Sequence, residues 1–178
     1  MHTFFIEKVE KVKKAVPIVE SKLKIRVSIK QNQISLKGKE FEEFLAEKIF
    51  KAIDFGFDKE DAILLKNENY VIEYLDIKNH TRRKNLEEVR GRVIGTDGKA
   101  KQAIETLTNS AIIINQNQVG IIVSSEYLDA TVQAVVSIIQ GAKHANVFAY
   151  LEKQNANKRK IKYEDLGLKE GVEELDTD

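Results

Sequence analysis

The 178-residue sequence contains no cysteine, a single proline and only three histidines. Without cysteine, the chain has no disulfide framework, no thiolate ligand for a metal and no thiol nucleophile. The histidines, His2, His80 and His144, lie far apart and have no partner at metal-ligand spacing, so we expect no metal site. No serine or threonine stands in a nucleophile-elbow pattern, and no carboxylate pair falls on a recognisable catalytic scaffold. The residues therefore do not predict an enzyme or a cofactor.

Long apolar runs are also absent. No segment approaches the length of a membrane span, and the N-terminus lacks the apolar core of a signal peptide. We therefore expect a cytoplasmic protein. With 42% hydrophobic and 32% charged residues, the chain should bury a core, and its length suits one large or two small domains.

An excess of charge of either sign is missing, because the formal net charge is only +1. The charge is nevertheless unevenly distributed. Residues 82–101 contain seven basic and three acidic residues, whereas residues 164–178 contain seven acidic residues and one lysine. Local charge decides what docks on a surface, so the basic segment remains compatible with nucleic acid.

The chain contains a faint internal repeat. Shifting the sequence by 85 residues aligns Gln31-Asn32-Gln33 with Gln116-Asn117-Gln118, and Gly56 with Gly141. Apolar positions follow the same offset through a helix, two strands and a further helix, which indicates a duplicated unit.

Hydrophobic periodicity predicts the elements of both copies. In the first copy we expect strands at 3–6, 24–29 and 33–37, helices at 9–23 and 41–55, and a short helix at 59–66 with Asp58 as its N-cap. In the second copy we expect a strand at 70–77, an arginine-rich helix at 82–93, a helix at 99–107, strands at 111–114 and 119–123, and a long helix from 126 to 152 that breaks at Gly141. Residues 154–160 resemble a solvated linker, and the acidic end a flexible tail.

The most informative segment is Ile94-Gly95-Thr96-Asp97-Gly98-Lys99, which lies between two helices of the second copy. Its two glycines allow a tight turn and a close approach of a ligand to the backbone. The N–H groups at the start of the following helix are available to an anion. A GxxG turn between helices, followed by two strands and a helix, is the layout of a KH domain, which clamps about four single-stranded nucleotides.

This layout predicts an α+β fold of two tandem type I KH-like units, each with a three-stranded sheet packed by helices. We place a degenerate unit at residues 1–66, a unit with the GxxG loop at 67–157, and a basic linker with an acidic tail at 158–178. In the first copy, the GxxG positions fall on Glu10-Lys11-Val12-Lys13, so we expect that unit to lack the clamp and to serve as an architectural or protein-facing surface.

In the second unit, we expect the basic side chains to contact phosphates and an apolar wall, which includes Ile104, to face the bases. The candidate RNA-binding residues are Arg90, Gly91, Arg92, Val93, Ile94, Gly95, Thr96, Asp97, Gly98, Lys99, Lys101, Ile112 and Ile114. Residues Arg82, Arg83 and Lys84 either extend this basic track or form a solvated helix face.

The segment 90–108 resembles the KH signature of the archaeal and eukaryotic small-subunit assembly factors called partner of Nob, RGRIIGxxGKxxxxIExxT. Residues 141–148 resemble the same family's GAxHxxVY stretch, and the segments 52–57, 62–65 and 70–77 resemble its AIxRGF…AxxLL…DI stretch. The resemblance covers about residues 3–155. This chain departs from the family at Thr96-Asp97, where a basic residue is frequent, and in the first unit, which lacks the glycines of many archaeal members.

The resemblance implies binding of the single-stranded 3′ region of small-subunit precursor ribosomal RNA. It also implies contacts with the Nob endonuclease and, in archaea, with the alpha subunit of initiation factor two. A rival hypothesis is a protein-interaction adaptor with weak RNA binding, which the acidic Asp97 and the near-zero net charge favour. A third, an enzyme that holds a nucleotide phosphate in the glycine loop, would need a base or metal near residues 92–99. We also expect the acidic tail to compete with RNA for the basic segment.

Overall fold

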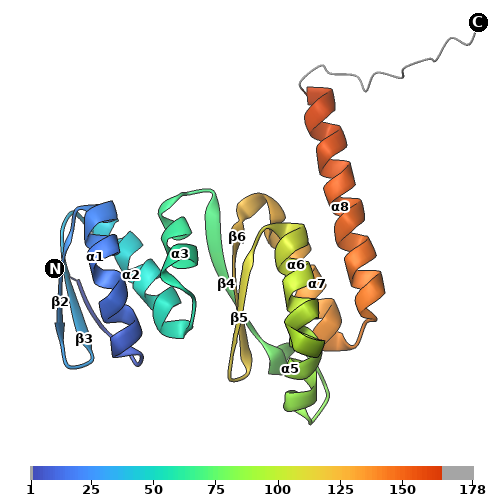
Figure 1. Cartoon of the computed structure of the whole chain (residues 1–178), viewed down its shortest axis with the longest axis horizontal. Coiled ribbons are helices and arrows are strands. Elements are labelled where there is room, and N and C mark those ends of the chain that lie inside the picture. Colours follow the sequence, from blue (N-terminus) through green and yellow to red (C-terminus); the bar gives the residue numbers. More distant parts are fainter. Residues whose placement is uncertain (1, 166–178) are drawn as a thin grey trace, which may run out of the picture.

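In a computed structural model, residues 2–165 form two three-stranded antiparallel sheets with helices, which confirms the expected α+β class (Figure 1). The first sheet has the strand order β1-β3-β2, and the second β4-β6-β5. The elements of the first unit are β1 (His2–Phe5), α1 (Val9–Leu23), β2 (Arg26–Lys30), β3 (Gln33–Lys37), α2 (Glu40–Phe55), α3 (Lys59–Ala62) and the 3-10 turn η1 (Ile63–Lys66).

The second unit has two α-helices and a 3-10 turn more than the first between its first two strands. Its elements are β4 (Tyr70–Asp76), α4 (Ile77–His80), α5 (Leu86–Ile94), η2 (Thr96–Gly98), α6 (Lys99–Thr108), β5 (Ala111–Asn115), β6 (Gln118–Ser124), η3 (Ser125–Tyr127), α7 (Leu128–Gln140) and α8 (His144–Asp165). The helix break expected at Gly141 is present.

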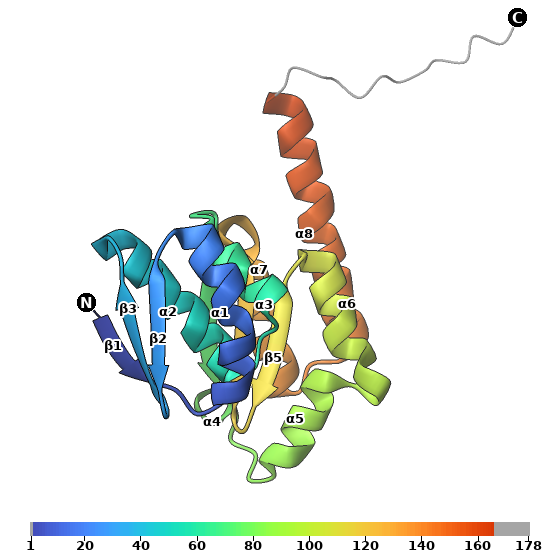
Figure 2. The ribbon, with the colours of Figure 1, turned by 60° about the vertical axis from the view of Figure 1, so that its left-hand side comes forward.

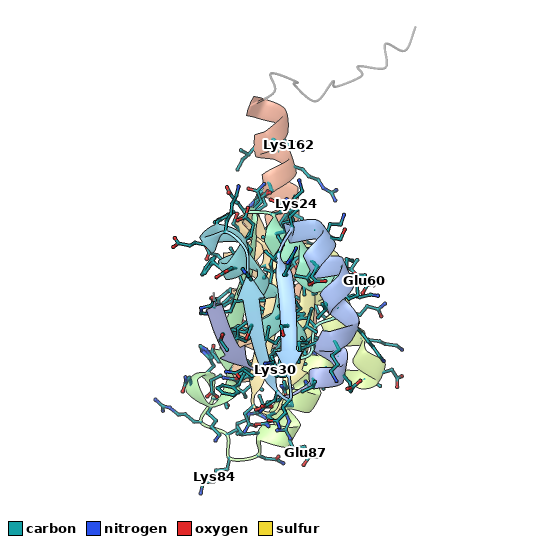
Figure 3. All side chains as sticks on the ribbon, turned by 90° about the vertical axis from the view of Figure 1, so that its left-hand side faces the viewer. Lys24, Lys30, Glu60, Lys84, Glu87 and Lys162 are labelled. Carbon is teal, nitrogen blue, oxygen red and sulfur yellow. The ribbon has the colours of Figure 1, made fainter. Side chains whose placement is uncertain are left out.

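The two units stack in layers, as Figures 1 and 2 show. From one end to the other lie the first sheet, the helices α1 to α3, the second sheet, the helices α5 to α7, and α8. One face of the second sheet packs against the helices of the first unit, where Ile122 joins the core and Ile72 and Ile113 pack against it. The corresponding face of the first sheet is open to solvent (Figure 3).

The internal repeat is visible in the backbone. The residues Lys24, Gln31 and Gly56 have positive φ angles of 54°, 55° and 145°, and the residues 85 positions later, Asn109, Gln116 and Gly141, have 48°, 51° and 108°. A side-chain contact repeats as well. The carboxylate of Glu20 accepts the backbone N–H of Val27 at 2.7 Å, and Glu105 accepts that of Ile112 at 2.8 Å. The duplicated unit predicted from the sequence is therefore confirmed.

The two copies differ where the glycine loop was predicted. The first strands correspond at an offset of 71, since Ile6 and Ile77 donate to the carbonyls of Asn32 and Asn117. The later elements correspond at 85, so the second copy contains 14 more residues between its first strand and α6. In the first copy, residues 10–13 continue α1 without a turn, as the missing glycines predicted.

Three local expectations need correction. Residues 82–84 precede α5 rather than belonging to it, because the Asn85 side chain accepts the N–H of Glu88 and starts the helix there. Asp58 stands at the N-cap of α3, but its carboxylate pairs with Lys11 at 3.0 Å instead of capping the helix. Residues 154–160 belong to α8 rather than to a linker.

Two side-chain contacts hold the C-terminal part of α8 against the second unit. The Asn155 amide donates to the carbonyl of Leu107 at 2.7 Å, and the ammonium group of Lys158 lies 3.6 Å from the ring centre of Tyr127. The predicted acidic tail lies, beyond Asp165, outside the described residues. Among residues 2–165, no helix is both long and apolar enough to cross a membrane.

Candidate nucleic-acid interface

The GxxG turn joins α5 to α6 through three residues with positive φ angles. Gly95, Asp97 and Gly98 have φ angles of 76°, 53° and 75°. A Cβ at Gly95 would lie 2.5 Å from the Cβ and 2.7 Å from the N atom of Ala100, so no side chain fits there. Aspartate is one of the few residues other than glycine that adopt the left-handed region with little strain. The turn therefore requires glycine at position 95, whereas Asp97 adopts its left-handed conformation with little strain.

Gly98 serves a different purpose. Nothing lies within 4 Å of the position that its Cβ would occupy, so here the missing side chain leaves open space rather than avoiding a clash. Thr96, Asp97 and Lys99 around it are exposed. Lys99 begins the ten-residue helix α6. A ligand can thus approach the backbone N–H groups at a helix N-terminus beside one exposed ammonium group.

Arg92 does not face this space. Its Nη2 atom donates a 2.8 Å hydrogen bond to the carbonyl oxygen of Ala142, and Nε2 of His144 donates one of the same length to the Arg92 carbonyl. Both contacts join the end of α5 to the turn between α7 and α8. The Arg92 guanidinium therefore holds the α7–α8 turn, and its contact with phosphate stays a prediction. Its Nε atom is buried without a partner within residues 2–165.

Arg90 crosses from α5 to the turn between β5 and β6. Its Nη1 atom donates to the Asn117 side-chain oxygen at 2.9 Å and to the Gln116 carbonyl at 3.3 Å. Within residues 2–165 no carboxylate forms an ion pair with Arg90, and the two hydrogen bonds restrain the position of its charge. The sequence contained a signal for this contact, because the Gln-Asn-Gln triplet stood out in the repeat.

Lys101 is neutralised within the protein. Its ammonium group lies 2.9 Å from Oε1 and 3.0 Å from Oε2 of Glu105, whose Oε1 also accepts the N–H of Ile112. Burial and the nearby Asp58 and Glu105 raise the pKa of Asp61, so this end of α6 carries acidic neighbours. The expected phosphate contact of Lys101 is therefore opposed by its own ion pair.

The apolar wall is mostly core. Val93, Ile104 and Ile112 have exposed fractions of 1%, 0% and 0% and cannot touch a base. The residues that remain accessible are Ile94, 39% exposed, and Ile114, which is half-buried. We expected Val93, Ile104 and Ile112 to contact bases, but these side chains lie in the core beneath the accessible surface.

Strand β5 is an edge strand of the second sheet, because within that sheet it pairs only with β6. The N–H of Ile112 points away from β6, since it donates to Glu105. Alternate residues of an edge strand share this direction, so Ile114 also directs its backbone polar groups outward. The GxxG turn, α6 and the open edge of β5 lie side by side (Figure 2), and we refer to the surface that these three elements form as the groove.

A comparison of family profiles places this geometry in a known family. The profile of the second KH domain of Pno1, described as a eukaryotic type KH-domain (KH-domain type I), matches residues 71–156. A KH domain-containing protein of Methanocaldococcus jannaschii is 33% identical over 131 residues, which are 73% of this chain and 58% of that protein. The pre-rRNA-processing protein pno1 of Emericella nidulans is 33% identical over 147 residues, which are 77% of this chain and 57% of that protein. The chain belongs to the Pno1/Dim2-type family of KH-domain proteins.

A solved structure of this family has the same fold. The aDim2p chain in the crystal structure of an a/eIF2alpha–aDim2p–rRNA complex from Pyrococcus horikoshii superposes with a TM-score of 0.76 at 23% identity, covering 88% of this chain and 94% of that chain. The profile match runs from β4 into α8 and includes the GxxG turn, β5 and the contact between Arg92 and Ala142. The chain spans less than three fifths of the length of the two Pno1/Dim2-type relatives named above.

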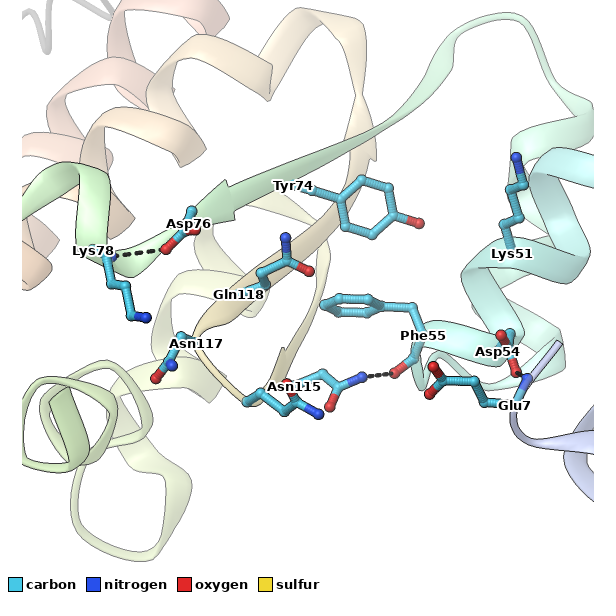
Figure 4. A pocket seen from close by; sticks show the side chains of 11 residues that line it. Glu7, Lys51, Asp54, Phe55, Tyr74, Asp76, Lys78, Asn115, Asn117 and Gln118 are labelled. Carbon is cyan, nitrogen blue, oxygen red and sulfur yellow. Dashed lines mark hydrogen bonds between the residues drawn. The ribbon is translucent and has the colours of Figure 1, made fainter. Parts of the chain in front are cut away.

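A separate cleft of about 710 Å³ lies between the two units (Figure 4). On its wall, the rings of Phe55 and Tyr74 meet edge to face at 4.9 Å, and the Asn115 amide donates to the Phe55 carbonyl at 2.9 Å. Burial raises the pKa of Tyr74 to about 12, so its hydroxyl remains protonated. The cleft carries both signs of charge, since its lining includes Glu7, Asp54 and Asp76 as well as Lys51 and Lys78. This mixture does not favour a phosphate track.

Proposed function

We propose that the second unit binds single-stranded RNA in the groove between the GxxG turn, α6 and β5. The observation that carries the proposal is the combination at Gly98 of open space, a left-handed backbone and an adjacent helix N-terminus. Residues 94–99 and Ile114 contact the RNA directly. The remaining candidates hold this surface in place: Arg90, Gly91, Arg92, Val93, Lys101 and Ile112. The RNA-binding unit spans residues 67–157, beside a clamp-free unit at 1–66.

The RNA that we propose is the 3′ region of small-subunit precursor ribosomal RNA, bound during ribosome assembly. The names of the relatives support this choice, since one is a pre-rRNA-processing protein and another was crystallised with rRNA and a/eIF2alpha. The alpha subunit of the initiation factor and a Nob-type endonuclease are the proposed protein partners. We propose binding without catalysis. Within residues 2–165, no group of three or more His, Asp or Glu side chains is placed to hold a metal ion.

A protein-interaction adaptor is the second candidate, and the ion pairing of the site favours it. Arg92 and Lys101 are engaged inside the protein, and Asp97 adds a negative charge to the turn itself. If Lys99 makes the main phosphate contact, the slope of log affinity against log salt is about −0.7 to −1.5. Separate titrations with an rRNA 3′-end oligomer and with the nuclease distinguish the two functions. Nuclease binding without measurable RNA binding would make the adaptor function primary.

The test of the RNA groove is Thr96→Asp, which places a second carboxylate in the turn. The expected result is a loss of RNA affinity of at least about tenfold, because like charges now face the phosphates. Fluorescence anisotropy with the rRNA 3′-end oligomer measures it. Thr106→Asp is the matched control, since Thr106 is exposed on the same helix away from the turn. Equal binding by both variants would show that the RNA does not use the GxxG turn.

A further inference from the structure

The open face of the first sheet is polar and contains no acidic residue. Thr3, Phe5, Arg26, Ser28, Lys30, Gln33, Ser35 and Lys37 form this face, because the alternate residues of the same strands are buried or pack against α1 and α2. The register places Thr3, Ser35 and Ser28 in one row across the sheet, and Phe5, Gln33 and Lys30 in the next. We name this surface the open face (Figure 3).

The repeat supplies an internal comparison for the open face. At the offset of 85, Arg26, Ser28, Ser35 and Lys37 correspond to Ala111, Ile113, Gly120 and Ile122 of the second sheet. Those residues are apolar or glycine because they pack against the first unit: Ile122 lies in the first unit's core, and Ala111 and Ile113 pack against that core. The same surface in the first copy has lost its apolar side chains and has gained basic ones. Solvent exposure alone requires polar residues there, but not residues of one sign.

The open face carries three basic side chains. Arg26, Lys30 and Lys37 are exposed, and none has an ion-pair partner in the part of the chain that the structure describes. The carboxylates of Glu20 and Glu43 accept the backbone N–H groups of Val27 and Gly38, beside Arg26 and Lys37, and form hydrogen bonds there rather than ion pairs with these two cations. Phosphate groups are therefore the natural counter-charge for this surface.

Phe5 is the one large apolar side chain on the open face and is 69% exposed. It stands two strands away from Lys30 in the same row, a separation of about 10 Å. An exposed ring beside unpaired cations and hydroxyl groups is the combination that binds single-stranded nucleic acid by stacking and charge. A protein partner fits less well, since lysine and serine, which make up much of this face, are depleted in the cores of protein interfaces.

We propose that the open face is a second binding surface for single-stranded RNA, with Phe5 stacking on a base and Arg26, Lys30 and Lys37 contacting phosphates. This surface belongs to the unit that has no GxxG turn and does not depend on the groove of the second unit. It lies at one end of the layered molecule, and the helices α1 to α3 separate it from the second sheet (Figure 1). A longer RNA therefore has two places of contact on one chain.

The test uses the full chain and an oligouridylate of about 12 nucleotides, within the usual range of site sizes. The triple variant R26Q/K30Q/K37Q removes the three charges, and K14Q/K22Q/K59Q is the matched control on exposed helix positions of the same unit. We expect the first triple to weaken binding about tenfold and to reduce the salt slope by about 2, because each phosphate contact contributes about 0.7. The control triple should change the affinity less than about twofold. Circular dichroism verifies that both variants fold.

A second measurement separates stacking from charge. Ultraviolet crosslinking of the parent chain should attach uridine to the tryptic peptide of residues 1–8, and Phe5→Leu should abolish that adduct and weaken binding about fivefold or more. The same measurements on the Thr96→Asp background distinguish the two sites, since loss of the groove leaves the effects of the open face intact. The proposal is overturned if the two triple variants bind alike. It is also overturned if Phe5→Leu has no effect while a glutamate decamer displaces the RNA, because the face would then recognise acidic protein.

Discussion

The guanidinium of Arg92 donates a 2.8 Å hydrogen bond to the carbonyl oxygen of Ala142, 50 residues further along the chain. The His144 ring returns a hydrogen bond to the carbonyl of Arg92. These two contacts join the helix that ends at the GxxG turn to the start of α8. The segments around residues 92 and 142 both resemble the family, and these contacts show that each segment supplies a hydrogen-bond donor to the other.

Replacement of Arg92 by alanine should therefore affect stability more than RNA contact. Loss of the charged hydrogen bond leaves the Ala142 carbonyl without its donor, and we expect a decrease of about 1–3 kcal/mol in the free energy of unfolding. Urea denaturation measures it. Lys99→Ala is the complementary variant, with stability within about 0.5 kcal/mol of the parent and a salt slope reduced by about 0.7. A stable R92A chain with strongly reduced RNA affinity would contradict this assignment and restore Arg92 as a phosphate ligand.

The two glycines Gly95 and Gly91 give opposite predictions for the same substitution. Gly95→Ala forces a Cβ to within 2.5 Å of Ala100 at a φ of 76°, and we expect a loss of about 3 kcal/mol from strain and overpacking. Gly91→Ala lies inside α5 with nothing within 4 Å of the new Cβ. Because alanine favours the helix, we expect a gain of about 0.5–1 kcal/mol. Thermal unfolding of the two variants would contradict the turn geometry if both moved in the same direction.

Asp61 predicts a pH dependence of stability. Burial, followed by Asp58 and other carboxylates, raises its pKa above the ordinary value of 3.8. The folded state therefore binds this proton more tightly than the unfolded state, so the contribution of Asp61 is most favourable below pH 3.8 and is lost as the pH rises through the raised pKa. Asp61→Asn should stabilise the protein at pH 7, by up to about 0.5 kcal/mol after solvent screening, and this gain should disappear below pH 3.8. Asp58→Asn, which loses a pair with Lys11, should show no such gain. Urea unfolding at several pH values tests both variants.

The sequence predicted the fold because each element has a local signal. Helix α1 spans the predicted residues 9–23, and the constant offset of 85 already contained the correspondence of the turns at Gln31 and Gln116. The linker assignment was wrong because residues 154–160 are polar throughout. What holds them in α8 is tertiary, through the contacts of Asn155 and Lys158, and no local pattern reports it.

The chemistry of the groove was less predictable, because a count of basic residues does not say where each cation points. Arg92 and Lys101 are residue types that commonly bind phosphate. In the structure, however, Arg92 donates to a backbone carbonyl and Lys101 pairs with Glu105. Similarly, alternation along β5 indicated two faces, but it did not show that Ile112 is fully buried while Ile114 is partly accessible. Gly95 was the reliable signal, since its backbone conformation and its closeness to Ala100 exclude any side chain.

The ion pair between Lys101 and Glu105 leads to a prediction for which the equivalent residue of the first copy serves as the control. In Glu105→Gln, the side-chain oxygen can still accept the N–H of Ile112, but the charge of Lys101 is no longer neutralised. The free ammonium group lies on α6 beside the groove, so we expect RNA to bind about two- to fivefold more tightly, with a salt slope steeper by about 0.7. Glu20→Gln makes the same change at the equivalent position of the first copy, where Glu20 holds Val27 and has no ion-pair partner among the described residues. Fluorescence anisotropy at several salt concentrations should therefore show tighter binding for E105Q and unchanged binding for E20Q. Equal shifts in both variants would mean that overall charge, rather than the release of Lys101, controls the affinity.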